Sequence, residues 1–311
     1  WMQYADVSEA GFSPEALDRA RRFFENRDGA AFLAVSHGAV VAAWGDVDRR
    51  FPAHSMRKSV LSALYGVFGD EIDLGLTLEQ LGIDDLAPLT DQEKQARVVD
   101  LLASRSGVYH PAAAEPREMS SSRPARGSHP PGTHWWYNNW DFNVAGTIFR
   151  QRTGRDIFEA FAERIAEPLG MQDYHPIDGW YDHEPGKSLH PAYSLRISTR
   201  DLARLGLLYA RGGTWQGTQV ISPSWISDST KAHSEIDLGE EYGTGYGFMW
   251  WVDGERGFSA RGYGGHVLAV YPDRDLVLVV RADTDHDQSL SNRAIDRLFE
   301  RVSQPAGATV R

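Results

Sequence analysis

Ser55 and Lys58 lie three residues apart in a Ser-x-x-Lys motif that opens an apolar run from Val60 to Phe68. The run predicts a helix, and residues three apart on a helix share a face with Cβ atoms about 5–6 Å apart. The Ser55 hydroxyl and the Lys58 ammonium are therefore predicted to point into one space. Serine becomes a useful nucleophile when a base takes its proton, and a lysine kept neutral by its surroundings can be that base. A serine helix cap followed by a solvated lysine gives the same pattern, so the motif alone does not distinguish a catalytic pair from a helix cap.

Tyr137 and Asn139 offer the third group that a serine and lysine pair needs in order to pass protons to a leaving group. They stand in a short non-helical stretch before the helical pattern of residues 142–149. The phenol could move a proton between Ser55 and a departing amine or alcohol, and Asn139 could hold Lys58 or a substrate carbonyl. The alternative for Tyr137 is one more aromatic residue in a tryptophan-rich patch.

The run Ala-Arg-Gly-Tyr-Gly-Gly at residues 260–265 ends a strand-like segment. Glycine is required where a backbone approaches a substrate closely, so this run is a candidate to supply backbone N–H donors to an oxyanion. The positive end of the helix that begins near Ser55 is a second source of such stabilisation. A plain hairpin turn is the alternative for the glycines.

The composition excludes several classes of function. The 311 residues carry 32 basic and 43 acidic side chains, and the net charge of −11 argues against nucleic acid or an anionic membrane as partner. An apolar run of about 18 residues is lacking, so no membrane-spanning helix is predicted. Zero cysteines exclude disulfides, thiolate metal sites and a cysteine nucleophile. The chain starts at Trp1 rather than Met, so we expect the native N-terminus to be missing, and the compartment and oligomeric state stay open.

Strand-like patterns lie at both ends of the chain and helical patterns lie between them. Residues 31–36 and 40–44 predict a hairpin, and runs between residues 246 and 280 predict an antiparallel meander with strands at 246–252, 258–260, 267–271 and 276–280. Helices are expected at 13–27, 95–103, 142–149, 157–166, 199–209 and 295–302, and long loops at 110–133 and 174–191.

These elements predict an α+β fold in which one antiparallel β-sheet, flanked by helices, unites the hairpin with the meander. Residues 1–69 and 191–311 would form the sheet domain. Residues 70–190 would form an inserted all-α domain.

The three motifs in this order resemble those of the serine β-lactamases and penicillin-binding proteins. Tyrosine at the head of the second motif is similar to the class C side of the family, which includes esterases, D-aminopeptidases and 6-aminohexanoate-dimer hydrolases. The stretch from Leu101 to Val108 resembles the family's Leu-Leu-x-x-x-Ser-Gly segment, and residues 131–133 and 198–203 also fit. The resemblance runs from Gly11 to Phe299.

The resemblance implies a β-lactamase/transpeptidase-like fold and acyl-enzyme chemistry that uses neither a cofactor nor a metal. Ser55 would be the nucleophile, with Lys58 and Tyr137 as general base and acid. The backbone N–H groups of Ser55 and Tyr263 would form the oxyanion hole. Asn139 and Gly262 would contact substrate.

Tyr109 and the Trp135-Trp136 pair are candidate pocket walls, with core or loop packing as the alternative for each. The third motif departs from β-lactamases, because Ala260-Arg261-Gly262 stands where the family has Lys-Thr-Gly. That lysine helps to bind a substrate carboxylate, so its loss resembles the esterase and oligomer-amide hydrolase branch. Arg261 could replace the lost cation, or its side chain could face solvent.

The sequence therefore predicts a serine hydrolase that acts on a small carboxylic ester or amide. A β-lactamase or D-Ala-D-Ala carboxypeptidase is one alternative, and a catalytically silent receptor of the same fold is another.

Other signals are weaker. The histidines at 129, 134, 175, 183 and 190 lack the spacing of zinc ligands, and the Asp-x-Asp-x-Asp run at 283–287 lacks the glycine and glutamate of a calcium loop. The Gly-x-Gly-x-Gly run at 243–247 does not open a helix, which disfavours a dinucleotide site.

Overall fold

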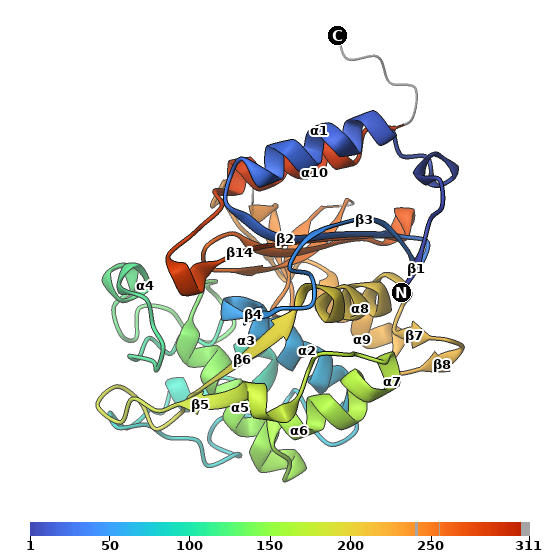
Figure 1. Ribbon diagram of the computed structural model, residues 1–311. Helices are drawn as coiled ribbons and strands as arrows, with labels where there is room; N and C mark the ends of the chain where they lie inside the picture. The colour runs from blue at the N-terminus through green and yellow to red at the C-terminus, as the bar shows by residue number, and fades with distance from the viewer. Residues whose placement is uncertain (240–241, 255, 306–311) are drawn as a thin grey trace.

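The computed structural model describes residues 1–239, 242–254 and 256–305. A mainly antiparallel β-sheet lies in the middle, helices from the two chain ends cover one face, and the other helices lie on the opposite side (Figure 1). The predicted fold class, a sheet flanked by helices with a helical part from the middle of the chain, is confirmed.

The N-terminal hairpin and the C-terminal strands join in one sheet, as predicted. β2 (Gly29–Ser36) and β3 (Ala39–Gly45) pair with each other, and β14 (Leu276–Ala282) pairs antiparallel with β2. Within the described residues the strand order is β1-β3-β2-β14-β13-β12-β11-β10-β9. The remaining strands of this sheet are β1 (Met2–Gln3), β9 (Ser234–Glu235), β10 (Gly245–Tyr246), β11 (Trp251–Asp253), β12 (Gly257–Gly262) and β13 (His266–Tyr271).

Helices α1 (Pro14–Glu25) and α10 (Asn292–Val302) lie side by side on one face of this sheet (Figure 1). Ser13 caps α1 by accepting a hydrogen bond from the Ala16 N–H, and Pro14 supplies the fixed φ of a first helical residue. On the opposite face α8 (Thr199–Ala210) packs against β14, β13 and β2.

The regular secondary structure between residues 70 and 190 is mainly helical, but it includes one strand and long loops connect its elements. β5 (Gly179–Asp182) lies inside the predicted loop and pairs with β6 (Ala192–Ser198), which also pairs with β4 (Arg50–Pro52). The helices there are α3 (Val98–Leu102), α4 (Arg117–Ser122), α5 (Asn139–Thr153), α6 (Ile157–Phe161) and α7 (Glu167–Leu169). Elsewhere the structure has α2 (Arg57–Val67), α9 (Pro223–Thr230), β7 (Thr214–Trp215) and β8 (Thr218–Gln219).

The strand predicted at 246–252 is wrong in its middle, because β10 and β11 are separated by a bend. Met249 has a φ of +64°, which a strand does not allow. The bend is held from outside, since the Phe248 N–H donates to the Ser229 carbonyl and the Met249 N–H donates to the Leu102 carbonyl.

One hydrophobic core continues from the sheet into the helical part. Val35 of β2, Leu61 of α2 and Phe149 of α5 belong to the same buried cluster. The two predicted domains, which meet at 69/70 and 190/191, therefore share one core. The division into domains stays a prediction.

Candidate active site

Ser55 lies in a 3₁₀ turn, η2 (His54–Met56), that runs directly into α2. The preceding strand β4 is fixed by its pairing with β6, where Phe51 lies opposite Ile197. Met56 is fully buried whereas Ser55 is partly exposed, so the turn anchors one side chain in the core and presents the next to solvent.

Lys58 joins the first two motifs. Its Nζ lies 2.8 Å from the Ser55 Oγ and 2.8 Å from the Tyr137 hydroxyl oxygen. The structure therefore brings together the three side chains for which the sequence predicts catalytic roles.

The surroundings of Lys58 favour the neutral amine. The side chain is buried, and its Nζ lies 4.4 Å from the centroid of the Tyr137 ring and 4.8 Å from that of Phe142. Burial, together with the nearby Arg57 cation, holds the pKa of Lys58 well below its ordinary value. Burial also raises the pKa of Tyr137 to about 12. The pair can therefore exist at neutral pH as a free amine beside a protonated phenol, in which the amine is the stronger candidate for the base.

Tyr137 is held in place by Ser104, whose backbone has a φ of +55°. The Ser104 Oγ donates to the Trp136 carbonyl at 2.7 Å and accepts from the Asn138 N–H at 3.0 Å. The Trp136 N–H in turn donates to the Ser104 carbonyl at 3.2 Å. The residues on both sides of Tyr137 are thus bonded to one serine, which gives the Leu101 to Val108 stretch a physical role.

Asp141 binds the same two stretches together from the first turn of α5. Its carboxylate accepts from the Ser106 hydroxyl and, at 2.9 Å, from the Asn138 side-chain amide. Burial raises the pKa of Asp141 well above its ordinary value. Sequence reasoning missed both Ser104 and Asp141, because neither is part of a motif head.

The third motif lies against the nucleophile turn, as its glycines predict. A Cβ atom at Gly262 would come within 2.9 Å of the Ala53 carbonyl oxygen and 3.2 Å of the His54 Cβ. Only glycine therefore lets β12 approach this closely. Tyr263 follows at the end of β12, with an exposed side chain whose ring meets that of His54 edge-on at 5.8 Å.

Asn139 does not bond to Lys58, so that part of its prediction is wrong. Its side-chain amide donates to the Ala114 carbonyl at 2.9 Å, because α5 turns it toward the loop that precedes α4. Its Oδ1 is buried and has no hydrogen-bond partner among the described residues. A contact of Asn139 with substrate stays a prediction.

Tyr109 and Trp136 lie next to each other, with ring centroids 5.8 Å apart and an edge-on geometry. Tyr109 is buried, and its hydroxyl lies 3.1 Å from the His129 Nδ1. Trp136 is partly exposed beside Tyr137. Trp136 is therefore the better placed of the two for a pocket wall, and Tyr109 supports it from behind.

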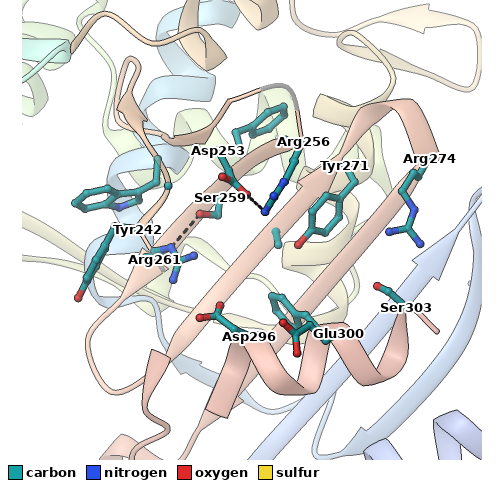
Figure 2. A pocket seen from close by; sticks show the side chains of 16 residues that line it. Tyr242, Asp253, Arg256, Ser259, Arg261, Tyr271, Arg274, Asp296, Glu300 and Ser303 are labelled. Atoms are coloured by element: carbon teal, nitrogen blue, oxygen red, sulfur yellow. Dashed lines mark hydrogen bonds and ion pairs between the residues drawn. The ribbon is translucent and has the colours of Figure 1, made fainter. Parts of the chain in front are cut away.

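Arg261 points into a cavity of about 360 Å³ between β12 and α10 (Figure 2). Its Nε donates to the Ser259 Oγ at 3.1 Å, and its Nη1 is buried without a hydrogen-bond partner among the described residues. The walls include Tyr242, Trp251 and Asp296, but Ser55 is not part of the described lining. The structure thus does not bring Arg261 to the nucleophile.

Comparisons with known proteins identify the family of this chain. A family model described as Beta-lactamase matches residues 18–301. The chain belongs to the β-lactamase family. A D-aminopeptidase of Brucella anthropi is 29% identical to this β-lactamase-family chain over 170 residues, which cover 46% of the chain but only 32% of the aminopeptidase.

Solved structures share the fold of this chain at low sequence identity. A family VIII carboxylesterase superposes with a TM-score of 0.68 at 16% identity, and the match covers 97% of this chain and 98% of the esterase. A Bacillus anthracis protein assigned as a 6-aminohexanoate-dimer hydrolase gives a TM-score of 0.67 at 18% identity, with 91% and 82% of the two chains covered.

Within this β-lactamase-family site, sequence reasoning also missed the groups that surround the lysine and tyrosine. Arg57 stacks over the Tyr193 ring at 4.5 Å and donates to the Asn143 side chain at 3.2 Å. Trp251 packs against Tyr137 with centroids 5.3 Å apart. Arg57 stands inside the first motif, so the missed signal was a second basic residue next to the lysine.

Other features add nothing to this site. Among residues 1–239, 242–254 and 256–305, no three His, Cys, Asp or Glu side chains are grouped so that they could hold a metal ion. The described helices include none with the length and apolar character that crossing a bilayer requires.

Proposed function

We propose that this protein is a serine hydrolase that forms an acyl-enzyme at Ser55 and acts on a small carboxylic ester or amide. The observation that carries the proposal is the position of Lys58, which lies 2.8 Å from both Ser55 and Tyr137 in surroundings that lower its pKa. A buried amine with a lowered pKa, in contact with a serine hydroxyl, can act as the base that activates the serine as a nucleophile.

Acylation follows from this arrangement. The Lys58 Nζ takes the Ser55 proton while the Oγ attacks the substrate carbonyl carbon, and the carbonyl electron pair moves onto oxygen. The backbone N–H groups of Ser55 and Tyr263 bind that oxyanion, and Ser55 lies at the positive end of α2. Collapse of the intermediate expels the alcohol or amine, which receives a proton from Tyr137, and Lys58 then returns the Ser55 proton to Tyr137. Water releases the acyl group by the same steps in reverse order.

The third motif bears on the class of substrate. Position 260, where β-lactamases carry the carboxylate-binding lysine, holds a buried alanine. A neutral ester or amide therefore suits this site better than a β-lactam antibiotic. Gly262 would lie along the substrate, Trp136 would form a pocket wall with Tyr109 behind it, and Asn139 would contact a substrate amide.

Labelling with a fluorophosphonate, read by intact mass, tests the proposal most directly. We expect one adduct on the parent protein and none on Ser55→Ala, while a Ser224→Ala control at an exposed serine keeps the adduct. A labelled parent then justifies comparing a phenyl ester with a chromogenic cephalosporin. An unlabelled parent would contradict the hydrolase and favour a silent receptor.

Arg261 offers a second, narrower test, because a substrate that extends past β12 could place a carboxylate near its unpartnered Nη1. Arg261→Ala would then weaken kcat/KM for an acidic ester by about tenfold, the cost of one lost charged hydrogen bond, and leave a neutral ester unaffected. Arg211→Ala, which removes an exposed arginine outside this cavity, is the matched control. Equal losses for both esters would contradict the carboxylate role.

A further inference from the structure

Arg281 is a fully buried cation beneath the nucleophile turn. Its Nη2 donates to the Pro52 carbonyl at 2.7 Å, three residues before Ser55, and its Nη1 donates to the Ile197 carbonyl at 3.2 Å. Its Nε donates to the Nδ1 of His266 at 2.7 Å. A buried cation is tolerated when its donors are satisfied, and here the acceptors belong to three different strands that meet behind the turn.

The bond from Arg281 fixes the tautomer of His266. Arginine is a donor only, so the His266 Nδ1 must accept and its Nε2 must carry the ring proton. Burial and the Arg281 charge keep His266 neutral, because they lower its pKa far below the ordinary value. The His266 Nε2 faces the Thr284 Oγ1 at 3.5 Å, and the Thr284 Oγ1 lies 2.9 Å from the His54 Nε2.

Thr284 therefore links His266 to His54, the residue before the nucleophile, by hydrogen bonds whose donors and acceptors are fixed. Its hydroxyl accepts from His266 and donates to His54, whose backbone has a φ of +49° that is uncommon for a histidine. Burial lowers the pKa of His54 to about 4, so its Nε2 is free to accept at neutral pH.

The other side of Thr284 touches the loop that carries the third motif. A Cβ atom at Gly264 would come within 2.3 Å of the Thr284 Cγ2, so the threonine methyl packs directly against the residue after Tyr263. The Leu290 N–H also donates to the Gly264 carbonyl at 2.9 Å. One small side chain thus contacts both segments that carry the proposed oxyanion donors.

Ion pairs anchor Thr284 on its own 3₁₀ turn, η8 (Thr284–His286). Arg49 binds the Asp283 carboxylate through both Nη atoms at 2.7 and 2.9 Å, and Arg196 binds Asp285. Two of the three carboxylates that resemble a calcium loop in the sequence, Asp283 and Asp285, thus have arginine partners that hold the turn.

We propose that Thr284 is a positioning residue that sets the spacing between the Ser55 and Tyr263 backbone N–H groups, through its hydroxyl to His54 and its methyl to Gly264. This inference rests on the proposed function. Donors to an oxyanion act mainly in the transition state, so a small displacement should lower kcat and leave KM nearly unchanged.

Two substitutions separate the halves of the side chain. Thr284→Val keeps the shape and the methyl contact but removes the hydroxyl, whereas Thr284→Ser keeps the hydroxyl and removes the methyl. Thr214→Val, which removes an exposed threonine hydroxyl at β7, is the control for loss of a surface hydrogen bond.

The experiment measures kcat and KM for a phenyl ester, the rate of fluorophosphonate labelling and the thermal midpoint for each variant. We expect Thr284→Val to lose about tenfold in kcat and in labelling rate with KM within twofold, Thr284→Ser to lose a smaller few fold because it keeps the hydroxyl and gives up only the methyl contact, and Thr214→Val to match the parent. In ¹⁵N spectra of labelled histidine, the parent should show His54 with its proton on Nδ1, and Thr284→Val should lose that preference.

Each contrary result has a distinct meaning. A labelled parent with a Thr284→Val variant of unchanged kcat overturns the positioning role alone. Equal losses in the valine and serine variants with matching falls in thermal midpoint also overturn it, since packing would then explain both. A parent that gives no Ser55 adduct overturns the proposed function and the positioning role with it.

Discussion

Two buried polar networks hold the two sides of the Ser55 site, and one is built around a hydrogen-bond donor whereas the other is built around acceptors. The sheet side centres on the Arg281 cation, which binds two backbone carbonyls and His266. The helical side centres on carboxylates, of which Asp141 binds Ser106 and Asn138.

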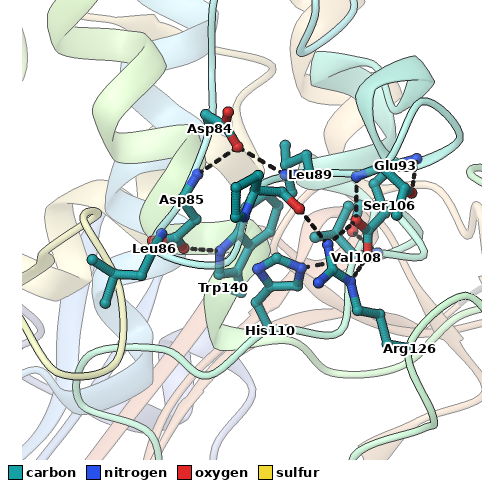
Figure 3. A network of polar contacts seen from close by, with 12 residues as sticks. Asp84, Asp85, Leu86, Leu89, Glu93, Ser106, Val108, His110, Arg126 and Trp140 are labelled. Atoms are coloured by element: carbon teal, nitrogen blue, oxygen red, sulfur yellow. Dashed lines mark hydrogen bonds and ion pairs between the residues drawn. The ribbon is translucent and has the colours of Figure 1, made fainter.

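Further carboxylates, Asp85 and Glu93, lie in the loops around Trp140 at the start of α5 (Figure 3). Asp85 accepts a hydrogen bond at 2.6 Å from the ring N–H of Trp140, the residue before Asp141. Glu93 accepts from Arg126 at 2.7 Å and lies 3.4 Å from the His110 Nε2. Asp85 also accepts from the Ser188 hydroxyl and from the Leu189 N–H, so these acidic side chains bind donors from several loops around the start of α5.

The difference follows from what each side has to hold. Strands that meet behind the nucleophile turn present carbonyls at their ends, and arginine, with five donors, can bind several of them at once. Loops present unpaired N–H and hydroxyl groups, which a carboxylate can accept. The sheet side therefore fixes main-chain positions, as an oxyanion hole requires, and the helical side fixes one side chain, the Tyr137 phenol.

Removal of the Lys58 amine should have the largest effect on activity, because Lys58 contacts both Ser55, on the sheet side, and Tyr137, on the helical side. Lys58→Ala is expected to lower kcat/KM by about 10²–10⁴-fold, the usual contribution of a general base. In the parent, kcat/KM should fall as pH drops through the lowered pKa of Lys58, since only the neutral amine can accept a proton. Steady-state kinetics across pH, with Lys187→Ala as an exposed control, measure both effects. Near-normal turnover of Lys58→Ala would remove the base from the mechanism.

Tyr137→Phe tests the helical side alone. The ring contacts with Trp251 and Phe142 remain, but the hydroxyl beside Lys58 is lost, so we expect about 10²-fold lower kcat. Because the pKa of Tyr137 is about 12, the parent should show no loss of activity from this phenol up to pH 10. Tyr4→Phe, far from the site, is the control. The phenolate would be the base instead if the activity of the parent decreases as the pH is lowered from 9 and the residual activity of Tyr137→Phe lacks this pH dependence.

Ser104→Ala should have a smaller effect on the same side. It removes two buried hydrogen bonds around Tyr137, which we expect to lower the free energy of unfolding by about 2 kcal/mol and kcat by several fold. Urea denaturation and ester kinetics test this, with Ser121→Ala in α4 as an exposed control. A variant that is less stable but fully active would show that Tyr137 does not need this support.

The sequence was sufficient for the parts of the fold that depend on local patterns. The hairpin and meander follow from alternation and turns, and the Ser55 contact with Lys58 follows from helix geometry. β5 was missed because an edge strand with mixed polar and aromatic residues has no clear period. The bend at Met249 was missed because its N–H is held by Leu102, far away in the chain.

The two networks escaped prediction for the same reason. The contact of Arg281 with Pro52 spans 229 residues, and that of Ser106 with Asp141 spans 35, so no local pattern contains either pair. One signal was present in the first case. Arg281 interrupts the apolar run of β14, and a charged residue in such a strand indicates a buried partner.

The weakest expected effect lies at the outer edge of the sheet-side network, in the Arg49 and Asp283 ion pair. Arg49 lowers the pKa of Asp283 to about 2, so the pair stabilises the fold above about pH 4, where an unfolded Asp is ionised, and this stabilisation is lost as pH falls toward 2. Arg49→Met should lower the free energy of unfolding by about 1 kcal/mol at pH 7 and by less at pH 3, because the pair is partly exposed.

Urea denaturation at the two pH values measures this, with Arg155→Met at a more exposed pair as control. The turnover of Arg49→Met tests whether this ion pair also contributes to catalysis from the sheet side of the site. If η8 positions Thr284, Arg49→Met should also lower kcat by a few fold at pH 7, whereas Arg155→Met should not. A variant that loses stability but keeps full turnover would confine the role of this ion pair to folding and show that Thr284 keeps its position without it.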